Sequence, residues 1–103
     1  MASWEEAFLI FSRWEQESVL VKFAEVVLWE ENGEVSPVAM GSPTAIDKVS
    51  FDPPTIKVSN GKQLDLKGAE FEFAFAEARG QSVCALEVTL ADERTFVFTE
   101  IPR

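Results

Sequence analysis

The feature that most constrains the fold is a series of short alternating apolar segments joined by tight turns. Asn32-Gly33 and Asn60-Gly61 each stand between two such segments. Asn-Gly is a strong hairpin signal, because both positions accept the positive φ that a two-residue turn requires. Parallel strands need a crossover of a dozen or more residues, and none of the predicted connections is that long. The chain is therefore predicted to form an antiparallel sheet of about six or seven short strands.

The longest predicted strand covers residues 18–30. Its alternation breaks at Ala24-Glu25, which predicts a bulge or bend there, and apolar residues then occupy both faces as far as Trp29. We expect that far half to be buried on both sides. The return segment, residues 35–40, contains Pro37, which cannot donate a ladder hydrogen bond, so this strand is predicted to lie on an edge or to begin late.

The later strands are predicted from their alternation. Gly41-Ser42-Pro43 indicates a bend before a separate short strand over residues 46–51. In residues 70–76 three phenylalanines alternate with glutamate and alanine, which predicts a core-facing stripe. Cys84 lies in the following apolar strand and is interpreted as a buried thiol. The positions predicted to point inward include Ile56, Val58, Leu64, Leu66, Phe71, Phe73, Phe75, Phe96 and Phe98.

Residues 3–14 differ from this pattern and predict an N-terminal helix. Ser3 and Glu6 have the spacing of a capping box, in which each side chain accepts from a backbone amide of the first turn. At 100° per residue the aromatic side chains of the segment fall within an arc of roughly 100°, and Leu9 points nearly opposite. We expect the helix to pack its aromatic face onto the strands and to close the sheet. The chain is then one domain, with the helix in residues 1–16 and a β-barrel in residues 17–103.

The predicted fold is mainly β with one N-terminal α-helix. A strongly bent antiparallel sheet would form a small closed or nearly closed barrel, with the helix over one open end or edge. A β-sandwich of two packed sheets is the alternative.

Charge and composition exclude several functions. The chain of 103 residues has a net charge of −9, and no basic patch is segregated in the sequence, so nucleic acid and anionic membranes are not expected partners. Histidine is absent and cysteine occurs once, which removes Ser-His triads and thiolate metal clusters. The five glycines are isolated, so there is no phosphate-binding loop. We therefore predict no enzyme activity, no catalytic residue, no cofactor and no metal site.

The acidic residues and the lack of targeting signals suggest a cytoplasmic protein with a protein partner. The longest apolar runs are too short to span a bilayer, and no basic segment precedes an apolar one at the N-terminus. Glu30, Glu31 and Glu34 surround one Asn-Gly turn and are interpreted as solvated turn residues. A basic protein is the hetero-partner that such a surface favours. Trp29 is the aromatic residue expected to be exposed, and with Leu9 it forms the predicted interaction surface.

A family resemblance enters at residues 77–83. This segment, EARGQSV, resembles the second Sm motif, in which an Arg-Gly turn precedes a hydrophobic strand. A helix followed by short, strongly bent strands is also the layout of Sm-like barrels, which are related to SH3-like barrels. The chain is similar to small uncharacterised bacterial proteins with an Sm-like barrel. This resemblance implies assembly into rings through edge strands and, in RNA-binding members, contact of uridine-rich RNA by Arg79 and Gly80.

Three functions follow from these observations. The first is a non-enzymatic interaction or assembly module that associates with itself through β-edges. The second is an Sm-like RNA-binding ring. The third is a barrel that binds a small ligand, with Trp29 and the phenylalanines lining its pocket.

Overall fold

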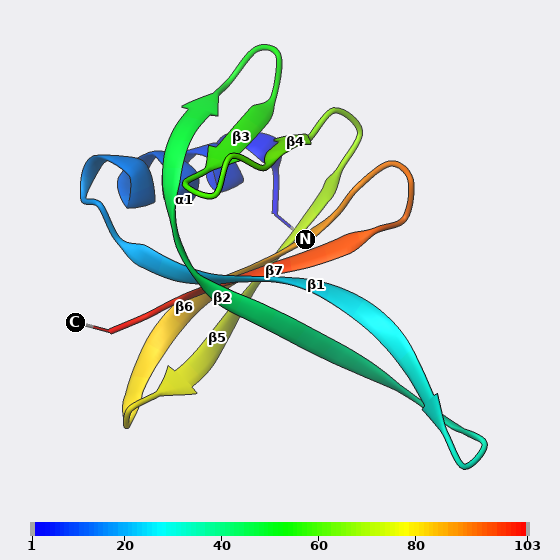
Figure 1. The fold of residues 1–103 in the computed structure, drawn as a ribbon. Coiled ribbons are helices and arrows are strands. Elements are labelled where there is room, and N and C mark those ends of the chain that lie inside the picture. Colours follow the sequence, from blue (N-terminus) through cyan, green and yellow to red (C-terminus); the bar gives the residue numbers. More distant parts are fainter. Residues whose placement is uncertain (1, 103) are drawn as a thin grey trace.

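The strands and the helix of this protein follow one another with short connections (Figure 1). The computed structural model describes residues 2–102, and for residues 36–40 and 78 it describes the backbone alone. The elements are α1 Trp4–Gln16, β1 Leu20–Glu31, β2 Glu34–Ser50, β3 Thr55–Val58, β4 Gln63–Asp65, β5 Glu70–Ala78, β6 Gln81–Thr89 and β7 Thr95–Glu100.

The strands form a single antiparallel sheet with the order β4-β3-β2-β1-β7-β6-β5. The prediction of a mainly β protein with one helix and an antiparallel sheet is confirmed for the described residues. The sheet is open, since β4 and β5 are its two edges, so a closed barrel is not formed. The sheet is nevertheless strongly bent. The bend brings the β3–β4 turn over the inner face of β1 and β7. There the Lys62 ammonium lies 5.1 Å from the centre of the Phe96 ring and 5.7 Å from that of Phe23.

The helix begins as the sequence predicts. The Ser3 hydroxyl accepts from the backbone N–H of Glu6, and the Glu6 carboxylate accepts from the N–H of Ser3. This capping box satisfies two amide groups that the first turn leaves without partners. Leu9 is 68% exposed on the outer face of the helix, as predicted. α1 does not combine the length and apolar character needed to cross a membrane, and the described residues contain no other helix.

The core lies between α1 and the inner face of the sheet. Phe11 and Trp14 are fully buried, and each packs against Phe98 of β7, with ring centres 5.2 and 6.3 Å apart. At the other end of the helix Trp4 stacks on Phe71 of β5 and on Phe51. The predicted inward residues of β3, β4 and β7 are buried in the same cluster. The helix therefore connects distant strands of an open sheet through aromatic contacts.

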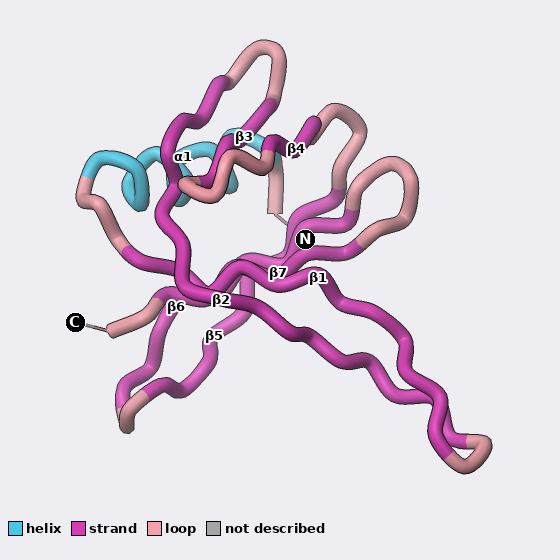
Figure 2. The backbone as a smooth tube through the Cα atoms, in the orientation of Figure 1, coloured by secondary structure: helices cyan, strands magenta, loops and turns pink. Residues whose placement is uncertain are grey.

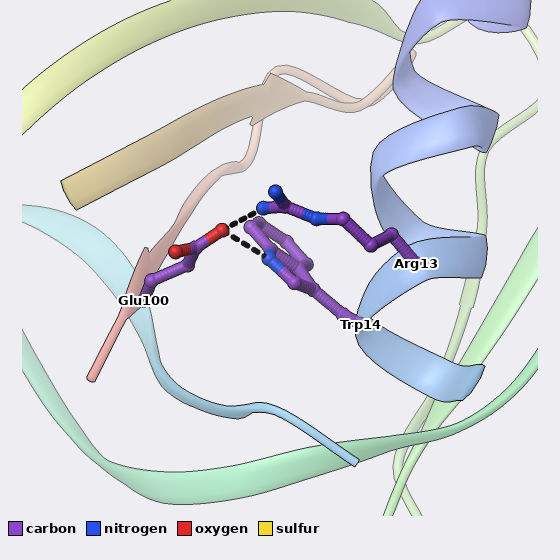
Figure 3. Close-up of polar contacts among 3 residues, drawn as sticks. All are labelled: Arg13, Trp14 and Glu100. Atoms are coloured by element: carbon purple, nitrogen blue, oxygen red, sulfur yellow. Dashed lines mark hydrogen bonds and ion pairs between the residues drawn. The ribbon is translucent and has the colours of Figure 1, made fainter. Parts of the chain in front are cut away.

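A polar contact also joins the end of α1 to the end of β7 (Figure 3). The Glu100 carboxylate accepts a hydrogen bond from the Trp14 indole N–H, with 2.7 Å between Nε1 and Oε1. The same oxygen is paired with the guanidinium of Arg13. The buried indole thus has an acceptor, and the first and last elements of the chain are held together.

Two predictions about β1 and β2 require correction. Pairing of β1 with β2 is continuous from Leu20 to Glu31, so of the bulge or bend predicted at Ala24-Glu25 the bulge is absent. Ala24 pairs with Gly41, where β2 bends, and the register shift lies between β2 and β3, near Asp47. The two strands predicted on either side of Gly41-Ser42-Pro43 form one strand of 17 residues, because the chain bends there while it stays paired with β1. At the bend a side chain on Gly41 would meet the Phe23 carbonyl oxygen at 2.3 Å. Glycine is required at this position by close backbone approach.

Candidate functional site

The most prominent surface feature is a two-stranded ribbon, residues 27–38, which we call the arm. The last pair between β1 and β7 is Val26 with Thr95, and the first pair between β2 and β3 involves Ile46. Between these limits the strands of the arm pair only with each other. The arm projects away from the helix in Figure 1, and its tip is the short loop seen in Figure 2. Asn32 and Gly33 both have positive φ there, as the predicted turn requires.

Apolar side chains are exposed on both faces of the arm. Leu28 is 75% exposed and Trp29 60%, and Val27 and Val35 are about half exposed. Val27 and Trp29 lie on one face, and Leu28 and Val35 on the other. The prediction that Trp29 is exposed is confirmed. The prediction that this half of β1 is buried on both sides is wrong, because no third strand or helix of the described chain covers it.

The tip of the arm is acidic. Glu30, Glu31 and Glu34 are all exposed around the turn. No group of three or more His, Cys, Asp or Glu residues able to hold a metal ion occurs in the part of the chain that the structure describes. The arm therefore combines an apolar stem with a strongly negative end.

The second surface is the outer edge of β5, which we call the β5 edge. β5 is the last strand of the sheet, and along this edge the described chain makes one contact, in which the N–H of Ala2 donates to the carbonyl of Phe71 at 2.9 Å. The side chain of Phe75 is 81% exposed and that of Phe73 38%. β7 pairs with β6 only as far as Ala85, so the ends of β5 and β6 project as a second hairpin (Figure 1). The prediction that all three phenylalanines are core residues holds for Phe71 and is wrong for Phe73 and Phe75, which are exposed. Phe75 pairs with Cys84 of β6, which lies beyond the last β6 residue paired with β7.

Arg79 and Gly80 form the turn of this second hairpin, and both have positive φ. The Arg79 guanidinium donates to the carbonyl oxygen of Pro102 at 3.4 Å and is exposed. Space around Gly80 is open, because no heavy atom lies within 4 Å of the point that a β-carbon would occupy. The structure therefore places the predicted RNA-contact residues at an exposed tip, and it places Leu9 on the helix and Trp29 on the arm as separate surfaces.

Cys84 lies across from Phe75 in the β5–β6 ladder and is half-buried against the core. Burial is the main cause that raises the pKa of its thiol, and the nearby Glu100 carboxylate acts in the same direction. The thiol therefore stays protonated at neutral pH. This agrees with a packing role rather than a nucleophilic one.

The surface depressions are lined by mixed polar and apolar residues. One of about 250 Å³ lies over β5 and β6 and includes Glu72 and Glu87, which are directly opposite each other. Another of about 430 Å³ is lined in part by Phe23 and Lys62. Trp29 stands apart from both on the arm. The ligand-binding prediction places Trp29 in one pocket with the phenylalanines, and neither of these two depressions includes Trp29.

Comparison with known proteins gives no further assignment. The chain matches no protein-family model, no curated protein and no solved structure. The functional argument therefore depends on the geometry of the arm and the β5 edge.

Sequence reasoning identified Trp29 but missed Leu28, Val35 and Phe75. The missed residues occur in good strand patterns, and a strand pattern indicates which face a side chain occupies without indicating whether that face is covered. A local signal did exist for the arm, since a two-residue turn between three glutamates is typical of a hairpin tip in solvent.

Proposed function

We propose that this protein is a non-enzymatic assembly module that associates with itself through strand edges. The observation that carries the proposal is the β5 edge, where unpaired backbone groups lie beside a phenylalanine that is 81% exposed. Free strand edges pair readily with other chains, and proteins that must stay monomeric commonly block them with lysine, proline or a covering loop. The described edge beyond Phe71 contains neither lysine nor proline.

The exposed apolar surface is large enough to contribute to binding but not to make it tight. The four exposed side chains of the arm present on the order of 400 Å² of surface, and Phe75 with Phe73 adds roughly half as much. At about 25 cal/mol per Å², burial of Phe73 and Phe75 from both copies at the β5 edge, roughly 400 Å² together, is worth up to ~10 kcal/mol. Association costs an estimated 4–15 kcal/mol of lost freedom, so we expect reversible assembly that depends on protein concentration.

The test is the molar mass in solution as a function of concentration and salt. We expect the mass by sedimentation or light scattering to rise above that of one chain as concentration increases. We also expect association to strengthen with salt, because each chain carries a net charge of −9 and screening reduces their mutual repulsion. A mass of one chain at every concentration up to about 0.5 mM, at low and high salt, would contradict the proposal.

A second candidate is capture of a basic protein by the arm. Its support is the combination of Trp29 and Leu28 with the three exposed glutamates at the tip. Binding of this kind weakens as salt rises, the opposite sign from self-association. Polylysine is a simple probe. Tryptophan emission of the protein that does not respond to polylysine at low salt would argue against this use of the arm.

An Sm-like ring that binds RNA is the third function considered. Its support is the N-terminal helix, the bent sheet and the exposed Arg79-Gly80 turn. The nearby β5 strand carries Glu70, Glu72 and Glu77, which disfavours phosphate close to this turn. Binding of oligouridine that is lost in Arg79→Ala would favour this function over the first.

A further inference from the structure

We propose that the β5 edge pairs with the β5 edge of a second copy, antiparallel and symmetric about Ala74, so that Phe73 of each chain lies opposite Phe75 of the other. This inference depends on the proposed self-association and specifies the contact that produces it. The evidence is the direction of the backbone groups on β5, the order of its side chains and the positions of its charges.

The backbone direction limits the ways in which two β5 strands can pair. Phe71 turns its carbonyl away from β6, because that oxygen accepts from Ala2. In a strand alternate residues present their backbone groups to the same side, so Phe73, Phe75 and Glu77 also point outward. Two copies can therefore exchange hydrogen bonds only in registers that place outward residues opposite one another.

The side chains select one of these registers. Symmetry about Ala74 places Phe73 of each copy opposite Phe75 of the other. These two equivalent pairs bring four aromatic rings together on one face. Symmetry about Phe73 would place Phe75 opposite Phe71, whose carbonyl is already occupied by Ala2. Symmetry about Phe75 would place Phe73 opposite Glu77. The Ala74 register pairs the two exposed phenylalanines with each other and places Phe71, which stays bonded to Ala2, only at the end of the ladder opposite Glu77.

The charges are compatible with the same register. Glu72 lies opposite Ala76 of the second copy, and Ala74 lies opposite Ala74. No carboxylate in the paired segment faces another carboxylate, and the remaining repulsion between two acidic chains acts over a longer range that salt can screen.

The arm is a poorer surface for a second copy. The Leu20 carbonyl accepts from the N–H of Ile101 on the β7 side of β1, so alternate residues present their backbone groups to that side. Beyond Val26, where β7 ends, the free edge of β1 therefore offers only the backbone groups of Leu28 and Glu30. The free edge of β2 contains Pro37, which has no N–H to donate. The second copy is therefore assigned to the β5 edge.

The test is a disulfide across the symmetry axis, made in a Cys84→Ala background so that no other thiol is present. Symmetric pairing places the two Ala74 Cα atoms about 4.5 Å apart, within the range for a disulfide. We expect Ala74→Cys to form a covalent dimer under mild oxidation. Glu72→Cys is the matched control, because it is exposed on the same face but lies about 13 Å from its symmetry mate.

The association constant gives an independent readout. Phe75→Ser is expected to weaken dimerisation by about tenfold or more, the change that 1.4 kcal/mol of lost aromatic burial produces. Leu28→Ser, at a similarly exposed site on the arm, leaves it unchanged. Circular dichroism checks that both variants stay folded. Equal cross-linking of the two cysteine variants, or dimerisation unaffected by Phe75→Ser, would overturn the β5 contact while leaving self-association in place. A protein that is monomeric throughout overturns both proposals.

Discussion

The contact between Glu100 and Trp14 offers a quantitative test of how the helix is held to the sheet (Figure 3). Trp14 is fully buried, and its indole N–H donates to the Glu100 carboxylate over 2.7 Å. The substitution Glu100→Ala removes this acceptor. It also removes the partner of Arg13, whose side chain is 48% exposed.

The expected cost follows from these burial values. A hydrogen bond to a charged group contributes about 1.5–3 kcal/mol, and a buried donor without an acceptor is unfavourable by a similar amount. The Glu100 side chain is 22% exposed, so water can partly replace it and the lower part of that range applies. The exposed Arg13 pair adds about 0.5 kcal/mol or less. Glu100→Ala should therefore destabilise the fold by about 2 kcal/mol, which lowers Tm by roughly 8–16 °C.

The measurement is urea unfolding followed by far-UV circular dichroism, arranged as a double-mutant cycle with Trp14→Phe. Phenylalanine has no N–H, so Glu100→Ala in that background should cost only the Arg13 contribution, about 0.5 kcal/mol. Glu100→Gln is the control that keeps an acceptor oxygen, and it should cost about 1 kcal/mol or less. If Glu100→Ala costs the same with Trp14 and with Phe at that position, the indole hydrogen bond does not stabilise the fold and the reasoning is refuted.

Three further predictions concern the core and the bend. Deletion of residues 1–14 should abolish cooperative unfolding or cause aggregation, because it removes the helix surface that covers the core. A soluble truncated chain with a cooperative urea transition would instead show that the sheet folds alone. Gly41→Ala should destabilise the fold by about 2 kcal/mol or more in urea unfolding, because the new methyl group would overlap the Phe23 carbonyl. The control is Ser42→Ala at the exposed neighbouring position, which should change the free energy of unfolding by no more than about 0.5 kcal/mol. Iodoacetamide should modify Cys84 slowly in the native protein and faster in urea at the same pH, because the pKa of the thiol is raised in the fold. The raised pKa also links Cys84 to the free energy of unfolding: its contribution is present below the ordinary thiol pKa of 9.0 and is lost as pH rises through the higher pKa of the folded state. An alkylation rate in the native protein equal to that in urea would contradict the burial of Cys84.

Much of the fold could be predicted because its signals are local. The capping box at Ser3 and Glu6, the Asn32-Gly33 turn and the alternation in β7 each depend on residues a few positions apart. Asn60-Gly61 also lies in a hairpin connection, but this connection spans residues 59–62 and only Gly61 has positive φ. The faces that β3, β4 and β7 turn to the core were also predicted correctly, as the burial of Ile56, Leu64 and Phe98 shows. These features are set by backbone geometry and by hydrophobic periodicity.

The candidate site could not be predicted in the same way, because it depends on the relative lengths of strands that are distant in sequence. β7 has six residues and pairs with β1 only as far as Val26. The apolar residues that follow in β1 therefore have no neighbour to cover them. Likewise Phe75 has the same alternating context as Phe71 in the sequence. Phe75 is exposed and Phe71 is buried because β7 pairs with β6 opposite Phe71 but not opposite Phe75, its last partner on β6 being Ala85.

The same difference in strand length explains why the exposed residues matter for function. A two-stranded ribbon without a third strand is marginally stable in water, and polar β-formers such as threonine would support it without exposing apolar surface. Leu28, Trp29 and Phe75 instead occupy these uncovered positions, where they contribute little to the stability of an isolated chain. Contact with another chain would cover both the side chains and the free backbone edges. The net charge of −9 opposes that contact over a distance, so the strength of assembly should depend on screening by salt or by a basic partner.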